Sequence, residues 1–215
     1  MGVDDNRDPP SETEVANMAL NLVGARSITS FTDGSPESEV CKRFYYDVRD
    51  ALLQSYNWNF ATKMAILAAD NTPPIFQRNN AFPLPADWLR TLRPFPEWNT
   101  LMLDWIVQVG DDGALRIYTN DPAPLNLRYI AKVYDVTKFS PLFTRALQFR
   151  LAGDIAEKLT QSNTKKTELY QQADATITEA KRIQAIETVP ADAPTDEWLM
   201  ARNSGASGPG GYFGW

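Results

Sequence analysis

Apolar residues recur at three- and four-residue spacing through residues 35–60, and this pattern predicts an amphipathic helix at the centre of the fold. The recurring positions are Val40, Phe44, Val48, Ala51, Leu52 and Tyr56. The charged positions fall mainly on the other side: Lys42, Arg43, Asp47, Arg49 and Asp50. Ser35 is a favourable N-cap and Pro36 suits the first helical position. Trp58 and Phe60 follow the helix, and this aromatic pair can anchor the next segment.

The same spacing predicts three further helices. The first begins after the cap residue Ser11 and stops at Gly24. Its expected apolar face holds Val15, Met18, Ala19 and Leu22. Two long helices follow Ser140-Pro141, with apolar stripes at Phe143, Leu147, Leu151, Ile155 and Leu159, and at Leu169, Ala173, Ile177, Ala180 and Ile183. Only a short connection near Ser162 separates these two helices, so we expect them to pack as antiparallel neighbours.

Between the helices the hydrophobic period becomes two, which is typical of strands. We expect a strand in residues 61–69, and a tight turn followed by a short strand in residues 84–90. Residues 105–118 predict a hairpin that turns at Gly110-Asp111-Asp112-Gly113. Its inward positions would be Trp105, Val107, Val109, Leu115 and Ile117. Alternation at Leu125, Leu127, Tyr129, Ala131 and Val133 predicts a further strand, which would complete an antiparallel meander.

These elements predict an α+β fold, in which a helical bundle of about four helices carries an inserted small antiparallel β domain and an extended C-terminal tail. The bundle would comprise residues 11–60 and 138–188, and the β insertion residues 61–137. Residues 1–10 are expected to form a flexible arm. Residues 189–215 are first proline-spaced and acidic and then rich in glycine and serine, a composition that cannot build a core of its own.

Composition narrows the possible functions. The chain of 215 residues has a formal net charge of −6, so it lacks the basic footprint that grips phosphate, although DNA could still pass by it without binding. It has no histidine, which removes the commonest general base and the commonest metal ligand. No apolar run approaches the ~20 residues that cross a bilayer, and the polar, acidic first ten residues are unlike a signal peptide. We therefore expect no membrane partner.

Two features could carry chemistry. Cys41, the single cysteine, excludes an internal disulfide and lies beside the apolar helix face, which favours a packed thiol over a reactive one. Asp111 and Asp112 could coordinate a cation or act as a carboxylate pair, but acidic residues in a hairpin turn are more often simply solvated. We assign no catalytic residue, no metal ligand and no cofactor, and expect that the protein is not an enzyme.

The tryptophans point to a partner surface. Trp58, Trp88, Trp98 and Trp105 lie in or beside predicted elements, where core packing explains them. The C-terminal tail carries apolar anchors outside any predicted element: Trp198, Leu199, Met200, Tyr212, Phe213 and Trp215. Exposed groups of this size usually mark a binding surface. We therefore predict that these residues dock on a neighbouring subunit or another protein. The alternative is that the tail folds back on its own domain.

Five stretches, taken in order, resemble the tail tubular protein A family, the head-to-tail adaptor of short-tailed bacteriophages. They are Leu20–Ala25, with Ile28 and Ser30 after it; Cys41–Tyr46, with Arg49–Leu53; Trp58–Ala61; Leu84–Arg90; and Ala146–Thr160. The likeness covers roughly residues 13–188. No single stretch is diagnostic, because each is also good core chemistry, and their succession carries the resemblance. The N-terminal arm and the aromatic C-terminal ending have no counterpart in it.

The resemblance implies a helical bundle with a small antiparallel β domain. It also implies a structural virion protein assembled in the host cytoplasm. In such a virion a homo-oligomeric ring, dodecameric in the family, joins the portal protein to the tail nozzle protein, with tail fibres as further possible neighbours. Genomic DNA would pass through the lumen without specific binding. Two alternatives from other classes are a small virion-associated carboxylate-dependent hydrolase and a monomeric binding module.

Overall fold

The computed structural model describes residues 10–71, 74, 78–92, 105–110, 112–160 and 163–187. Within these ranges the chain forms four helices: α1 (Glu12–Val23), α2 (Pro36–Ser55), α3 (Pro141–Thr160) and α4 (Asn163–Glu187). The strands are β1 (Thr62–Leu67), β2 (Asn80–Pro83), β3 (Trp88–Thr91), β4 (Trp105–Val109), β5 (Leu115–Thr119) and β6 (Leu125–Ala131). The expected α+β fold is confirmed, whereas residues 1–9 of the predicted arm and the whole predicted tail lie outside the described residues.

The helix starts follow the local signals in the sequence. The side-chain oxygen of Ser35 accepts a hydrogen bond from the backbone N–H of Ser38 at 3.2 Å, with Pro36 in the first turn. Ser11 caps α1 and Ser140 caps α3 in the same way, with N–H to Oγ distances of 3.1 and 3.3 Å. Gly24 ends α1 with a φ of 80°, a left-handed conformation that glycine adopts without strain.

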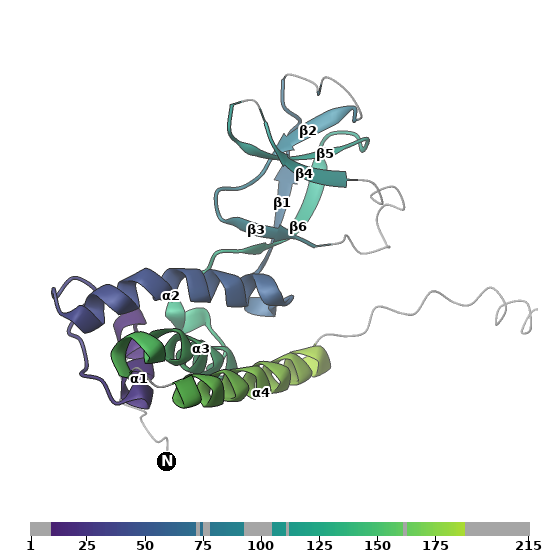
Figure 1. Ribbon diagram of the computed structural model, residues 1–215. Helices are drawn as coiled ribbons and strands as arrows, with labels where there is room; N and C mark the ends of the chain where they lie inside the picture. Colours follow the sequence, from purple (N-terminus) through teal and green to yellow (C-terminus); the bar gives the residue numbers. More distant parts are fainter. Residues whose placement is uncertain are drawn as a thin grey trace, which may run out of the picture.

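Helix α3 is the centre of the helical layer, since it packs against α1, α2 and α4 (Figure 1). The predicted stripe of α3 is confirmed for Phe143, Leu147, Leu151 and Ile155, all of which are fully buried. Its contact with α4 depends on Gly153. A Cβ atom at that position would lie 2.6 Å from the ring of Tyr170, so only glycine allows the two helices to approach this closely.

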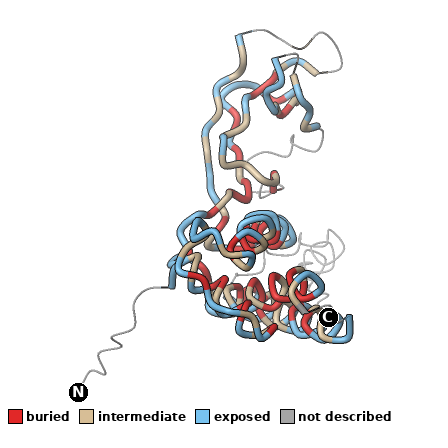
Figure 2. The backbone as a smooth tube through the Cα atoms, turned by 60° about the vertical axis from the view of Figure 1, so that its left-hand side comes forward, coloured by how far each residue is buried: buried red, intermediate tan, exposed pale blue. Residues whose placement is uncertain are grey.

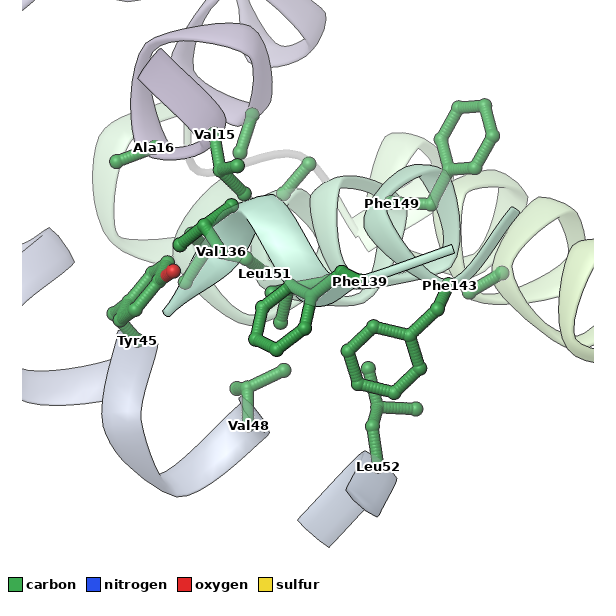
Figure 3. Close-up of a cluster of buried hydrophobic side chains, with 14 of the residues drawn as sticks. Val15, Ala16, Tyr45, Val48, Leu52, Val136, Phe139, Phe143, Phe149 and Leu151 are labelled. Atoms are coloured by element: carbon green, nitrogen blue, oxygen red, sulfur yellow. The ribbon is translucent and has the colours of Figure 1, made fainter. Parts of the chain in front are cut away.

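Helix α2 lies between the sheets and the other helices (Figure 1). Its buried face is rotated from the predicted one and consists mainly of Cys41, Tyr45, Val48, Arg49, Leu52 and Leu53. Figure 3 shows Tyr45, Val48 and Leu52 directed toward α3 and toward residues 136–139. The prediction placed Arg49 on the polar side and Ala51 on the buried side. Both placements are wrong, because Arg49 is 2% exposed and Ala51 is exposed.

Smaller rotations occur in α1 and α4. Met18 was expected inside but is 49% exposed, because α1 turns Ala16, Leu20 and Val23 toward α3 instead. Ile183 was expected on the buried stripe of α4 and is also exposed. Gln184 takes the buried position, and its side-chain amide donates a hydrogen bond to the backbone carbonyl of Asn57. A polar side chain can replace an apolar one here because its hydrogen bond offsets the lost hydration.

The strands form two antiparallel sheets of three strands, ordered β1-β6-β3 and β2-β5-β4. The hairpin prediction is confirmed, since β4 pairs with β5 in a register that sets Val107 against Ile117. The meander prediction is wrong, because β6 does not continue from β5 but pairs with β1 on one side and β3 on the other. The alternation of apolar residues in β6 requires only that one face of the strand is buried. It does not specify which strands pair with β6.

The two sheets share one small core. Phe82 and Ile117 of one sheet pack with the β6 residues Leu125, Leu127, Tyr129 and Ala131. Val109 and Leu115 were expected inside, but both are exposed where the β4–β5 hairpin reaches its turn. Figure 2 shows the larger set of buried residues where the helices face one another, and a second set in the sheets. The opposite face of β6 contributes Ile130 to the helical core, which joins the two layers.

Asp87, in the turn before β3, holds three parts of the first sheet together. Its carboxylate accepts hydrogen bonds from Lys63 of β1 at 2.6 Å and from the hydroxyl of Tyr129 of β6 at 3.0 Å. Its backbone carbonyl accepts a hydrogen bond from the N–H of Lys132 at 2.7 Å. Partial burial opposes ionisation of Asp87, but these two side-chain hydrogen bonds outweigh it and lower its pKa.

We expect Asp87→Asn to lower the free energy of unfolding at pH 7 by about 1–2 kcal/mol, because it replaces charge-assisted hydrogen bonds with neutral ones. Since the folded-state pKa of Asp87 is lowered, its contribution is present above the unfolded pKa of about 3.9 and is lost as pH falls further. The stability difference between wild type and variant should therefore narrow below about pH 4. Urea unfolding at several pH values measures this stability difference. Asp47→Asn, at an exposed position of α2, serves as the control. A difference that stays constant with pH would contradict this account.

Candidate functional surfaces

The predicted partner-binding residues lie outside the described residues. Trp198, Leu199, Met200, Tyr212, Phe213 and Trp215 all fall in residues 188–215. The docking prediction for the tail therefore stays a prediction. The described residues offer four other features with functional potential: a buried charged cluster, two grooves between helices, and a set of exposed apolar residues on the strands.

The residues considered for chemistry in the sequence have structural surroundings. Cys41 is fully buried, and this burial raises the pKa of its thiol to about 11, so the thiolate is scarce at neutral pH. Asp112 pairs with Arg116, whose guanidinium holds the pKa of that carboxyl well below its usual range. Asp111 lies outside the described residues. Within the described ranges, no group of three or more acidic or cysteine residues could hold a metal ion.

The buried charged cluster is centred on Arg49. The guanidinium lies 2.8 Å from a carboxylate oxygen of Asp50 and 3.6 Å from one of Glu12 at the start of α1. The aromatic rings of Tyr46 and Tyr134 approach it to 5.1 and 4.9 Å, which adds cation–π attraction. The cluster thus joins α1, α2 and the segment after β6.

The remaining contacts of the cluster support an architectural role. Tyr46 donates a hydrogen bond to Glu12 at 3.2 Å, and Lys132 lies 3.5 Å from Asp50. Burial, and next the negative charge of Glu12, raise the pKa values of Tyr45 and Tyr46, so both phenols stay neutral in the physiological range. A buried cation shared between two carboxylates fixes the relative positions of its helices.

A first groove of about 500 Å³ lies between α2, α3 and α4, and we call it the helical groove. Its apolar lining includes Phe44, Ala51 and Ile177. The sequence predicted Phe44 and Ala51 for the buried face of α2, so the rotation of α2 places part of its predicted apolar stripe in this open groove. Periodicity detects such a stripe but cannot tell whether the chain's own core or an open groove receives it.

The helical groove also contains the carboxylates of Asp47, Asp154 and Asp174. Asp154 accepts a hydrogen bond from the hydroxyl of Tyr170 at 2.5 Å, and Asp174 lies 3.8 Å from Arg150. Burial and this hydrogen bond raise the pKa of Tyr170 to about 12. Asp154 thus already has a partner that serves the packing of α3 against α4, whereas the exposed Asp174–Arg150 pair contributes little.

A second groove of about 410 Å³, the aromatic groove, lies between the end of α4 and the segment that leads into α3. Its apolar lining consists of Phe60, Phe139, Pro141, Leu142, Ala180 and Ile183. Phe60 and Phe139 belong to an aromatic cluster with Phe143, with ring centroids 4.9–5.6 Å apart. These packed rings form the floor of the groove, and half-buried Phe60 presents aromatic surface at its open side.

The strands expose several large apolar residues. Met64 and Ile66 of β1 are 80% and 75% exposed and lie on the same face of an edge strand. Ile106, Val109 and Leu115 add exposed apolar surface on β4 and β5. Edge strands with exposed apolar side chains are prone to association with other chains.

Comparison with known proteins adds no identification. Neither a scan against protein-family models nor a search of curated proteins finds a match to this chain. In the described part of the chain, no helix is both long and apolar enough to span a lipid bilayer.

The Arg49 cluster gives a direct test of the architecture. We expect Asp50→Ala to lower the free energy of unfolding by about 3 kcal/mol, because it leaves a buried guanidinium without its closest counter-ion. The double variant Arg49→Met, Asp50→Ala should recover much of this loss, since it removes the buried charge as well. Chemical denaturation measures both, and Lys132→Ala, which removes a partly exposed contact, should cost less than about 1 kcal/mol. A double variant as unstable as Asp50→Ala would show that unpaired charge is not the cause.

Proposed function

We propose that this protein is a structural, non-enzymatic subunit of the head-to-tail adaptor ring of a short-tailed bacteriophage. In this role copies of the chain associate into a ring, with a dodecamer as the family's stoichiometry. The ring sits between the portal protein and the tail nozzle protein in the virion. Tail fibres are possible further neighbours, and assembly takes place in the host cytoplasm.

The observation that carries the proposal is the ordered succession of the five stretches that resemble the tail tubular protein A family. The fold is consistent with it, because the resemblance implies a helical bundle with a small antiparallel β domain. Four helices and two antiparallel sheets are what the described residues contain. Fold alone does not give function, so the succession of stretches remains the stronger support.

The fourth stretch meets the residues between the second and third stretches at the joint between the helices and the sheets. Arg90, in the fourth stretch, donates a hydrogen bond to the side chain of Asn57 at 2.7 Å. Gln54, at the end of α2, donates to the backbone carbonyl of Leu89 at 3.3 Å. Trp58, in the third stretch, is buried beneath this joint. A subunit that transmits load between two large assemblies benefits from a joint with this many contacts.

The charge of the chain supports a passive role toward DNA. A formal charge of −6 gives DNA few cationic groups to bind, and binding by release of counter-ions requires such groups. A channel wall with little positive charge lets a polyanion pass without holding it. The exposed apolar residues of the strands and the two grooves offer surfaces for protein partners instead.

The two alternatives have less support. A carboxylate-dependent hydrolase would most readily use Asp47, Asp154 and Asp174 of the helical groove, but Asp154 already accepts a hydrogen bond from Tyr170 that serves the packing of α3 against α4. A monomeric binding module would leave the exposed apolar strand residues Met64 and Ile66 without a purpose.

Two measurements test whether the chain forms a ring: light scattering after gel filtration, and negative-stain microscopy. Each is made with and without the portal protein of the same virus. We expect rings with a central channel when portal is present, even if the free chain is monomeric, because a template supplies the contacts that start assembly. Monomers alone in the presence of portal would contradict the proposal. Turnover of cell-wall material by the purified chain, lost in Asp154→Asn without unfolding, would favour the hydrolase.

A further inference from the structure

The aromatic groove is an open apolar site at the end of the helical layer. Phe60 is only half-buried, and Ile183 on α4 is 38% exposed, although both border the packed cluster of Phe139 and Phe143. The volume of about 410 Å³ lies within the range of pockets that hold small ligands or bulky side chains. A large aromatic side chain placed there would extend the edge-to-face packing of the cluster.

The chain itself supplies a segment of matching chemistry. Glu187 lines the groove and is the last described residue of α4, so the C-terminal tail starts at the rim of the site. Trp198, Leu199 and Met200 follow eleven to thirteen positions later. A chain of that length reaches at most about 45 Å, which is enough to cross to an adjacent subunit of a ring.

The charges of the segment and of the groove are complementary. Asp196 and Glu197 precede the apolar residues, and Arg202 follows them. The groove carries Lys138 in the segment before α3 and Glu187 at the end of α4. Lys138 lies 3.6 Å from Asp135, but both side chains are largely exposed, and such a pair contributes little and can exchange its partner.

We propose that residues 196–202 of one copy occupy the aromatic groove of an adjacent copy, with Trp198 against Phe60 and Phe139. The acidic residues that precede Trp198 face Lys138, and Arg202 faces Glu187. The proposal rests on the proposed function for the self-association of the chain. It adds the contact that links successive subunits, with Trp198 as the residue that contributes most to binding.

The sequence favours the groove of an adjacent copy over the chain's own. Docking in its own groove would require the chain to reverse direction between Glu187 and Trp198. Pro190 and Pro194 lie in that interval, and each interrupts a helix and pushes the residue before it toward extended conformations. Proline-spaced segments favour extended conformations, which lead away from the groove at which the tail begins.

Cross-linking between two single-site variants of the full chain tests this contact. One variant carries Met200→Cys and the other Ile183→Cys, an exposed position in the groove where folding tolerates the change. The native Cys41 stays in place, since its burial keeps it unreactive. We expect the concentrated equimolar mixture to form a disulfide-linked pair at least about tenfold faster than a mixture in which Met18→Cys, a more exposed position on α1 (49% against 38%), replaces Ile183→Cys.

Charge reversal provides a second readout. Lys138→Glu in the groove variant should slow the cross-link several-fold. Glu197→Lys in the tail variant should restore the rate only in combination with Lys138→Glu, because the electrostatic contact is then re-formed with opposite signs. Circular dichroism confirms that each variant keeps its helix content.

Two results would overturn the proposal. One is a rate for the groove mixture no faster than for the Met18→Cys control. The other is a chain carrying both cysteines that closes only within itself, which would assign the groove to the chain's own tail. The ring proposal has a separate outcome. Cross-linked pairs without rings in micrographs would contradict only the proposed ring. Rings on portal without the cross-link would contradict only the proposed contact in the aromatic groove.

Discussion

The burial of Trp58 at the end of α2 is the interaction on which the relation between the helices and the sheets depends. Its indole N–H donates to the backbone carbonyl of Leu52 at 2.9 Å, which ties the ring to the last turns of α2. The ring packs edge-to-face against Tyr56 and Phe143, at centroid distances of 5.2 and 5.1 Å. The side chain of Trp58 thus packs against the last turns of α2, contacts α3 and fixes the start of β1. A smaller residue at this position would leave a cavity between these three elements.

This joint also explains why the two layers form one structure although each has its own core. The sheets contact the helices mainly through Ile130, Leu92 and Leu89, and Arg49 joins the segment after β6 to α1 and α2. Polar contacts therefore surround the apolar residues that join the sheets to the helices. Each buried charge in them has a counter-ion, which the low dielectric of the interior requires.

Local signals in the sequence predicted the elements well and their partners less well. Caps such as Ser35 and Ser140 act within one helical turn, and strand alternation acts within one strand, so both can be recognised without knowledge of the fold. The rotation of α2 could not be recognised in this way, because its stripe of Val40, Phe44 and Ala51 adjoins a second apolar face with Tyr45 and Leu53. Which face is buried depends on α3, roughly a hundred residues away in the chain.

The candidate surfaces likewise depend on contacts between residues that are far apart in the sequence. Arg49 looked like a solvated residue because its counter-ion Glu12 belongs to another helix, and no spacing rule connects the two. The pairing of β6 with β1 and β3 rather than with β5 is likewise a long-range choice. The aromatic groove combines α4 with residues of η1 (Asn59–Ala61), with the end of η2 (Val136–Lys138) and with the residues that follow η2, so it exists only in the folded chain. Trp198 and its neighbours, by contrast, were recognisable from composition alone.

Electron microscopy of virions with a labelled copy of this chain tests the proposed ring between portal and nozzle most directly. A compact density tag fused at the N-terminus, averaged over many particles, should appear as a closed ring at the junction of head and tail. Label confined to the fibres, to the nozzle tip or to the head interior would contradict the account, as would virions with no label at all.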